Sequence, residues 1–370
     1  MTFRPRFMAT GIGSMPFEDA SKAVELSLSS LTEAPFWPQL PRLGLREQME
    51  IQYSEGLPRK VIDEEKGRMY VDTSGDYSEE LATFYEAYVV AMDPDEGTGD
   101  CSAMAISPDY AHGLYAFEQH LRDSGTKKPF IKVQTTGPIS FALTIVDENK
   151  RALYYNEEFR DVVVKALAMK CRWQIQRFAP YAGRVICFVD EPILSAFGSS
   201  TYVSVKREDV VGHLHEVVEA IHTDNALAAI HCCGNTEWSI PIDAGVDIVN
   251  FDAYEYGETI GMYPEAVREH LNRGGALAWG VVPTSTAVRD QTVDSLAEHF
   301  ERLIDALAQK GIERKLITEQ ALVTPSCGTG SMEPADAERV FALTRALSER
   351  MRERYGFTGQ PAASVATVGE

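Results

Sequence analysis

The sequence predicts an α/β fold, a single (β/α)8 TIM barrel. Short apolar runs rich in β-branched and aromatic residues alternate with longer segments of helical periodicity along the 370 residues. Strands that alternate with helices favour a parallel sheet, and eight such units favour a closed barrel. With 44% hydrophobic residues, the chain is also long enough to bury the core of a large barrel.

The predicted strands come at intervals that leave room for a helix between most neighbours. In chain order they are Met8–Ser14, Ala34–Trp37, Phe130–Thr135, Val185–Asp190, Leu227–His231, Val246–Phe251, Ala276–Val282 and Leu322–Ser326. Apolar residues spaced three and four apart are typical of amphipathic helices. Such segments occur at Glu157–Phe178, Arg207–His222, Pro264–Leu271, Ser295–Lys310 and Pro334–Tyr355.

One connection is much longer than the others. Residues 39–128 separate the second and third strands and include the acidic loop Met92–Asp100. Long insertions of this kind usually shape a substrate site. We therefore predict one catalytic barrel domain over residues 1–356, with the insertion at 39–128, and a disordered tail at 357–370.

Composition excludes several classes of function. The formal net charge is −20, from 35 basic and 55 acidic residues, which argues against nucleic acid as a partner. We expect no signal peptide and no membrane span, because no long apolar run occurs. The 6 cysteines are unevenly placed and do not resemble a disulfide framework, so a reducing cytoplasm is expected.

Polar residues follow nearly every predicted strand at its carboxyl end, where a barrel of this type carries its active site. These residues are Ser14, Gln39, Thr136, Gly137, Asp190, Glu191, His231, Cys233, Asp252, Thr284 and Cys327. A stable core does not need this pattern. The pattern therefore indicates an active site at the carboxyl ends of the strands.

Three of these residues have the chemistry of a zinc site. His231 and Cys233 lie two residues apart, and Cys327 ends the last strand. One histidine and two thiolates suit zinc, and three protein ligands leave a coordination position open for substrate. Cys232 should point to the opposite side. Asp252 and Glu255 are candidates for a fourth ligand that the substrate displaces.

The charge of this ligand set favours one kind of reaction. Zinc with a neutral histidine and two thiolates has no formal charge, so it is a weak Lewis acid that suits a thiol substrate bound as thiolate. Alkyl transfer to a thiol is the expected chemistry. Hydrolytic deamination, the competing zinc reaction, requires H-x-E and P-C-x-x-C motifs that the ligand segments lack.

Five segments together resemble the catalytic domain of the cobalamin-independent methionine synthase family, within the uroporphyrinogen decarboxylase and methionine synthase superfamily. They are Ile12-Gly13-Ser14-Met15-Pro16, Thr136-Gly137-Pro138, Val189-Asp190-Glu191-Pro192, His231-x-Cys233-Gly234-Asn235-Thr236 and Pro325-Ser326-Cys327-Gly328. Because they span residues 12–328, the resemblance covers most of the chain. Within this family, the chain is similar to the short "core" methionine synthases.

The resemblance implies a zinc-dependent methyltransferase that makes methionine from homocysteine. Ile12, Gly13 and Ser14 would contact the amino acid, and Asp190 would hold its amino group, with Asp190 and Glu191 assigned to catalysis. The physical chemistry agrees, since a Gly-Ser turn offers N–H and hydroxyl donors to a carboxylate. Asp190 supplies the charge opposite to an ammonium.

Departures from the family pattern bear on the methyl donor. The chain has no room for the second, N-terminal barrel of the folate-dependent enzymes, and Pro283-Thr284-Ser285 stands where they carry a proton-donating histidine. We therefore expect methylcobalamin or another methylated corrinoid as donor, carried by a separate corrinoid protein. The alternatives are transfer to another thiol such as coenzyme M, a folate-dependent methionine synthase, a metal-free tetrapyrrole decarboxylase, and a non-catalytic metal- or corrinoid-binding protein.

Overall fold

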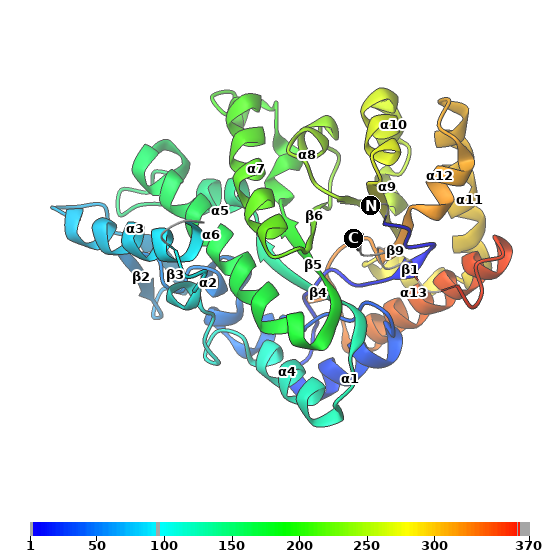
Figure 1. Cartoon of the computed structure of the whole chain (residues 1–370), viewed down its shortest axis with the longest axis horizontal. Helices are drawn as coiled ribbons and strands as arrows, with labels where there is room; N and C mark the ends of the chain where they lie inside the picture. The colour runs from blue at the N-terminus through cyan, green and yellow to red at the C-terminus, as the bar shows by residue number, and fades with distance from the viewer. Residues whose placement is uncertain (1–2, 94–96, 361, 363–370) are drawn as a thin grey trace, which may run out of the picture.

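The computed structural model describes residues 3–93, 97–360 and 362. Within these residues, seven parallel strands form one curled sheet with helices around it, as expected for a TIM-barrel-like α/β fold (Figure 1). The order across the sheet is β1-β9-β8-β7-β6-β5-β4. The strands are β1 (Met8–Ala9), β4 (Lys128–Thr136), β5 (Ala182–Asp190), β6 (Leu227–Cys232), β7 (Ile248–Phe251), β8 (Ala276–Val282) and β9 (Ala321–Pro325).

The predicted second strand, Ala34–Trp37, lies between β1 and β4 but is not a regular strand. It bridges the two edges of the sheet through isolated parallel pairs, Phe36 with Lys132 and Ser14 with Gln39. Pro35 and Pro38 flank the first of these pairs and lack the N–H that a ladder needs, so a continuous strand cannot form here. The prediction of eight regular strands was wrong at this position, although the segment occupies the place of the missing strand.

The same irregularity shortens the first strand. The prediction gave Met8–Ser14, whereas β1 covers only Met8–Ala9. Beyond it the chain leaves β9 and turns toward the proline-containing segment, where the Gln39 N–H donates to the Gly13 carbonyl at 3.0 Å.

Alternate residues of each strand point into the barrel. Along the strands these inward side chains change from apolar to polar. A buried apolar cluster fills the interior near the amino ends of the strands. Its members include Met8, Phe130, Ile186, Leu227, Ile248, Ala276 and Leu322. Further along the strands, Thr136 pairs with Asp190 and Asp190 with His231. The polar side chains are therefore gathered at the carboxyl ends, where the site lies.

Helices pack around this sheet through a second and larger core (Figure 1). The longer ones are α1 (Ala20–Ser30), α6 (Glu157–Phe178), α7 (Arg207–Thr223), α10 (Pro264–Asn272), α11 (Val293–Gln309) and α13 (Pro334–Arg354). The shorter ones are α5 (Pro138–Thr144), α8 (Ser239–Asp243), α9 (Ala253–Tyr256) and α12 (Arg314–Glu319). Among the described residues, no helix is both long and apolar enough to cross a membrane.

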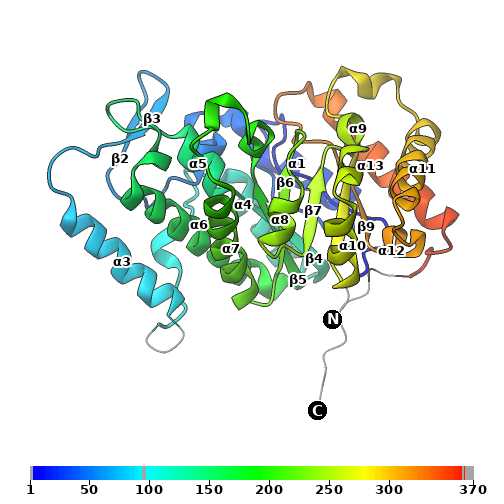
Figure 2. The same ribbon diagram turned by 90° about the horizontal axis from the view of Figure 1, so that it is seen from above.

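Residues 39–128 form several elements of their own. They are α2 (Met49–Gln52), the hairpin β2 (Lys60–Asp63) and β3 (Arg68–Val71), α3 (Ser78–Met92) and α4 (His112–Ser124). The hairpin and α3 lie at one end of the molecule in both views (Figure 2). Residues 94–96 of the predicted acidic loop are outside the described part of the chain.

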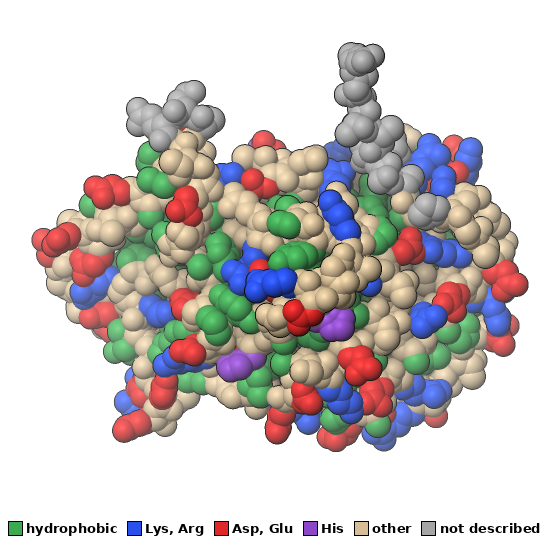
Figure 3. Space-filling view, turned by 60° about the horizontal axis from the view of Figure 1, so that its bottom comes forward, with side chains coloured by type: hydrophobic (Ala, Val, Ile, Leu, Met, Phe, Trp, Pro, Cys, Tyr) green, Lys and Arg blue, Asp and Glu red, His purple; other side chains and the backbone are tan. Residues whose placement is uncertain are grey.

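The described part of the predicted tail packs against the N-terminal segment. The Phe357 ring lies 6.1 Å from that of Phe7, and the Ala362 N–H donates to Glu33 at 3.2 Å. Residues 361 and 363–370 are outside the described residues, so their predicted disorder stays a prediction. Acidic and basic side chains are interspersed over the face shown in Figure 3, so the charge of −20 is not gathered into one patch on that face.

Candidate metal centre

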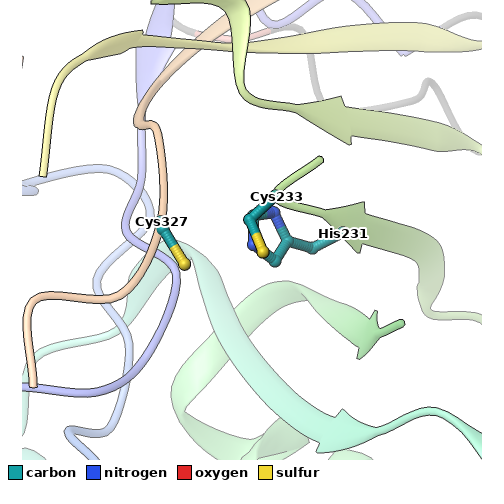
Figure 4. A group of neighbouring side chains, drawn as sticks. All are labelled: His231, Cys233 and Cys327. Atoms are coloured by element: carbon teal, nitrogen blue, oxygen red, sulfur yellow. The ribbon is translucent and has the colours of Figure 1, made fainter. Parts of the chain in front are cut away.

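His231, Cys233 and Cys327 converge at one point, although almost a hundred residues separate the last two. His231 lies near the end of β6, Cys233 follows that strand, and Cys327 follows β9. Their potential ligand atoms all lie within 4.8 Å of one another. The three side chains point toward a common centre in Figure 4. The predicted ligand group is therefore assembled by the fold. Cys232 is buried in the outer core, as predicted.

The tautomer of His231 is set by a neighbour that the sequence did not reveal. Asn250 Nδ2 donates to the Ala278 carbonyl and to Thr324 Oγ1, both at 2.8 Å. This fixes Asn250 Oδ1 as the acceptor facing His231 Nδ1 at 2.5 Å. The neutral ring then carries its proton on Nδ1. Nε2 is buried and makes no hydrogen bond within the described chain, so its lone pair is free for a metal.

Substitution of Asn250 by alanine is expected to weaken zinc binding by about 10- to 100-fold, because the ring loses the partner that fixes its tautomer and orientation. Competition with a chelator of known affinity would measure the change. Substitution of Thr324 by valine keeps the Asn250–His231 hydrogen bond and serves as the milder control. Equal zinc affinity in the wild type and the Asn250 variant would contradict this role.

The Cys233 and Cys327 thiols lie beside each other and affect each other's pKa. The Cys233 pKa is lowered, chiefly because the Cys327 thiol donates to it and His231 lies beside it. The same hydrogen bond and burial raise the pKa of Cys327. One thiolate is thus already favoured at this position. A neutral imidazole nitrogen and two soft sulfurs form a donor set that fits zinc.

These three residues form part of the wall of a cavity of about 540 Å³. Three of the predicted substrate residues, Ile12, Ser14 and Asp190, line the same cavity. Gly13 lies between the first two, and a Cβ at this position would be 2.6 Å from Gln39 Oε1. A glycine is therefore required for the close approach of this turn to Gln39. The structure brings the predicted metal ligands and amino-acid contacts together.

Asp190 has the geometry of a binding carboxylate. It is 6% exposed, and its Oδ1 atom has no hydrogen-bond partner among the described residues. Burial raises its pKa, while the charges of Lys132 and His231 oppose that shift. A buried carboxylate oxygen without a partner is costly. Its orphaned oxygen fits a ligand that brings a hydrogen-bond donor or a positive charge.

Glu191 was predicted to be a catalytic residue, but it is fully buried and does not line the cavity. Its oxygens accept from the N–H groups of Ile139 and Ser140 at 2.9 and 2.8 Å and from the Ser140 hydroxyl at 2.6 Å. Its position is therefore that of a cap on the N-terminus of α5. Gly137 belongs to the same arrangement, since a Cβ there would lie 2.1 Å from Glu191 Cδ.

Replacing Glu191 with glutamine should change the pH dependence of stability. Burial raises the pKa of Glu191 from 4.5 to about 7. Between these values the folded state binds more protons at this group than the unfolded state. Its contribution is therefore present below pH 4.5 and is lost as pH rises through about 7, with a slope of at most about 1.4 kcal/mol per pH unit.

Urea unfolding of both proteins at several pH values would test this expectation. The wild type should lose stability relative to the glutamine variant as pH rises across that window. Two parallel curves would show that Glu191 does not titrate there.

Neither candidate for a fourth ligand joins the metal group. Within the described chain, that group holds only His231, Cys233 and Cys327. Asp252 is buried, and its Oδ1 accepts from the Glu255 N–H at 3.0 Å as the N-cap of α9. Burial raises the Asp252 pKa to about 6. The cap occupies one oxygen of Asp252, and neither Asp252 nor Glu255 lies in the group of potential ligands.

The cavity also contains residues that the sequence analysis missed. Glu47 and Arg42 come from the irregular start of the 39–128 segment, where no periodicity marks them. Glu47 is 2% exposed, and His112 holds it through its N–H and its Nδ1, both at 2.8 Å. Lys132, which does not itself line the cavity, had a readable signal, because it follows Phe130 on the inward face of β4.

Comparisons with known proteins support the fold. The sequence matches no family model and no curated protein. A solved structure of a B12-independent methionine synthase from Shewanella sp. W3-18-1, in complex with selenomethionine, is similar over 96% of this chain and 99% of that chain, with a TM-score of 0.50 and 11% identity. The A. niger ochratoxinase structure matches 50% of this chain and 43% of its own, with a TM-score of 0.26 and 16% identity. At these identities the first match shows a shared fold, and the second is too weak to support an argument.

Proposed function

We propose that this protein is a zinc-dependent methyltransferase of the methionine synthase type. It transfers a methyl group to the sulfur of homocysteine and gives methionine. The observation that carries the proposal is that three zinc-type donor atoms and the buried, unpartnered Asp190 oxygen border one cavity. The solved neighbour adds support, since it is a methionine synthase crystallised with a methionine analogue.

Different residues would bind three parts of the acceptor, which are its thiol, its α-ammonium group and its α-carboxylate. His231, Cys233 and Cys327 would hold zinc, which binds the thiol and lowers its pKa so that the sulfur is a nucleophile at neutral pH. Asp190 offers its free oxygen to the α-ammonium group. Ser14, which also lines the cavity, offers a hydroxyl to the α-carboxylate.

The cysteines and Asp190 border the same cavity, and this arrangement would give the reaction its selectivity. Sulfur and ammonium of one ligand must reach the cysteines and Asp190 at the same time, which favours a short amino acid with a terminal thiol. In the reaction the bond between the methyl carbon and its donor breaks and a carbon–sulfur bond forms. A positioned thiolate removes much of the entropic cost of this encounter.

We propose a methylated corrinoid, carried by a separate protein, as the methyl donor. The support is that Pro283-Thr284-Ser285 stands where the folate-dependent pattern has its proton-donating histidine. The neighbouring structure belongs to an enzyme described as B12-independent, so the two kinds of donor are compared directly in the assay.

The purified protein should contain about one zinc ion per chain, as expected for a single three-ligand centre. Homocysteine would then be supplied with methylcobalamin in one assay and with a methylated folate in another. Methionine formed from methylcobalamin is the expected result. A protein without zinc, or turnover with folate alone, would overturn the proposal.

A further inference from the structure

Lys132 is a fully buried lysine beneath the cavity. It lies on β4, is 0% exposed, and points toward the barrel interior, where Phe188 and Phe36 flank it. Its Nζ atom lies 4.7 Å from the centre of the Phe188 ring and 5.6 Å from that of Phe36. Apolar barrel interiors rarely contain a cation, because removing an ammonium from water costs several kcal/mol.

The contacts of Lys132 link it to the proposed acceptor site. Nζ donates to the Ile12 carbonyl and to Gln134 Oε1, the latter at 2.9 Å. Both acceptors are neutral, so they do not balance its charge. Ile12 lines the cavity and begins the Ile12–Ser14 turn. Lys132 therefore holds the turn that carries Ser14.

A second link is electrostatic. Asp190 is the acidic group whose charge acts on Lys132, and Lys132 in turn is the first of the charges that favour an ionised Asp190. Burial lowers the Lys132 pKa to about 8, which still leaves it mostly charged at neutral pH. One buried cation thus acts on both of the elements that would receive the amino-acid end of the acceptor.

We propose that Lys132 is a positioning residue for the amino-acid end of the acceptor. Its ammonium fixes the Ile12 carbonyl, and with it the Gly13–Ser14 turn, and its positive charge acts on the Asp190 carboxylate, which lies on the inward face of the neighbouring strand β5. This inference rests on the proposed function. It adds a residue that touches neither zinc nor the reacting sulfur.

The chain provides a matched control. Lys170 on α6 is also 0% exposed, and its Nζ donates to the Met104 carbonyl at 3.1 Å. Neither lysine lines the cavity itself, but Ile12, which Lys132 holds, lines it, whereas Met104 does not. Removing either ammonium should change stability, but only the loss of Lys132 should change the recognition of homocysteine.

The test measures ligand affinity calorimetrically on zinc-loaded protein, with L-homocysteine and 2-mercaptoethanol as probes. Lys132→Met should weaken homocysteine binding by at least about tenfold and leave 2-mercaptoethanol within about twofold. Lys132→Gln keeps a donor for Ile12 without the charge and should give an intermediate loss. Lys170→Met should leave both affinities unchanged.

A double-mutant cycle separates positioning from general destabilisation. In an Asp190→Asn background, Lys132→Met should lose most of its effect on homocysteine, because the carboxylate charge is already absent. An equal loss in both backgrounds would overturn the electrostatic part. If the methionine variant does not fold, unchanged homocysteine affinity in Lys132→Gln would overturn that part as well.

The outcomes also distinguish this inference from the proposed function. If zinc-loaded wild-type protein does not bind homocysteine, the proposed function fails and this inference fails with it. If the wild type binds homocysteine and Lys132→Met binds it equally well, only the role of Lys132 is overturned.

Discussion

Replacing Cys233 with alanine is expected to abolish stoichiometric zinc binding and to reduce methionine formation by about three orders of magnitude. Cys233 supplies one of the three donor atoms that lie within 4.8 Å of one another. Without it only a histidine and a thiol remain, which is too few for a stable zinc site. Metal-ion catalysis contributes several kcal/mol, and each 1.4 kcal/mol is about tenfold in rate. Metal analysis and the methylcobalamin assay would measure both effects.

Cys232 is the matched control for this substitution. It is the adjacent residue, carries the same side chain, and is fully buried in the outer core instead of facing the cavity. Cys232→Ala should cost about 1 kcal/mol or more in stability and keep its zinc. Zinc loss in both variants to the same extent would mean that the metal is not held where we propose.

Replacing Asp190 with asparagine should lower kcat/KM for homocysteine by about 100-fold, since removing one member of a buried charge pair costs roughly 2–5 kcal/mol. Asparagine keeps the shape of the side chain and removes its charge. Zinc content should be unchanged, because Asp190 is outside the metal group. Steady-state kinetics with homocysteine would measure the loss.

A thiol without an amino group provides the control for Asp190. Methyl transfer to 2-mercaptoethanol or coenzyme M should be slow in the wild type and no slower in the variant. If both acceptors lose the same factor, Asp190 acts on the thiol or the donor and does not select an amino acid. This result would favour another thiol acceptor, such as coenzyme M.

The barrel and its candidate metal ligands could be predicted because both depend on local patterns. Alternation along each strand determines which side chains face inward, and the carboxyl ends of parallel strands meet at one edge. His231, Cys233 and Cys327 obey both rules. Pro35 and Pro38 make the second strand irregular, and their effect on pairing is readable from the sequence.

The remaining site residues depend on contacts between distant segments. Glu191 caps α5, more than fifty residues before it in the chain, and strand position alone could not separate that role from catalysis. Glu47 reaches the cavity from an irregular insertion. Asn250 matters only because Ala278 and Thr324 fix its amide. Spacing in one sequence contains no information about such partners.

The irregular segment at residues 34–39 has a consequence for how the ring holds together. Seven strands are joined edge to edge, whereas among the described residues isolated pairs complete the ring at this segment. The regular hydrogen-bond ladder is interrupted at this seam, so local opening should cost less there than between the long regular strands. Ser14 lies on one side of the seam and Lys132 on the other. An amino acid held by Ser14 and Asp190 would therefore tie the two edges together, so that binding of the acceptor and closure of the ring stabilise each other.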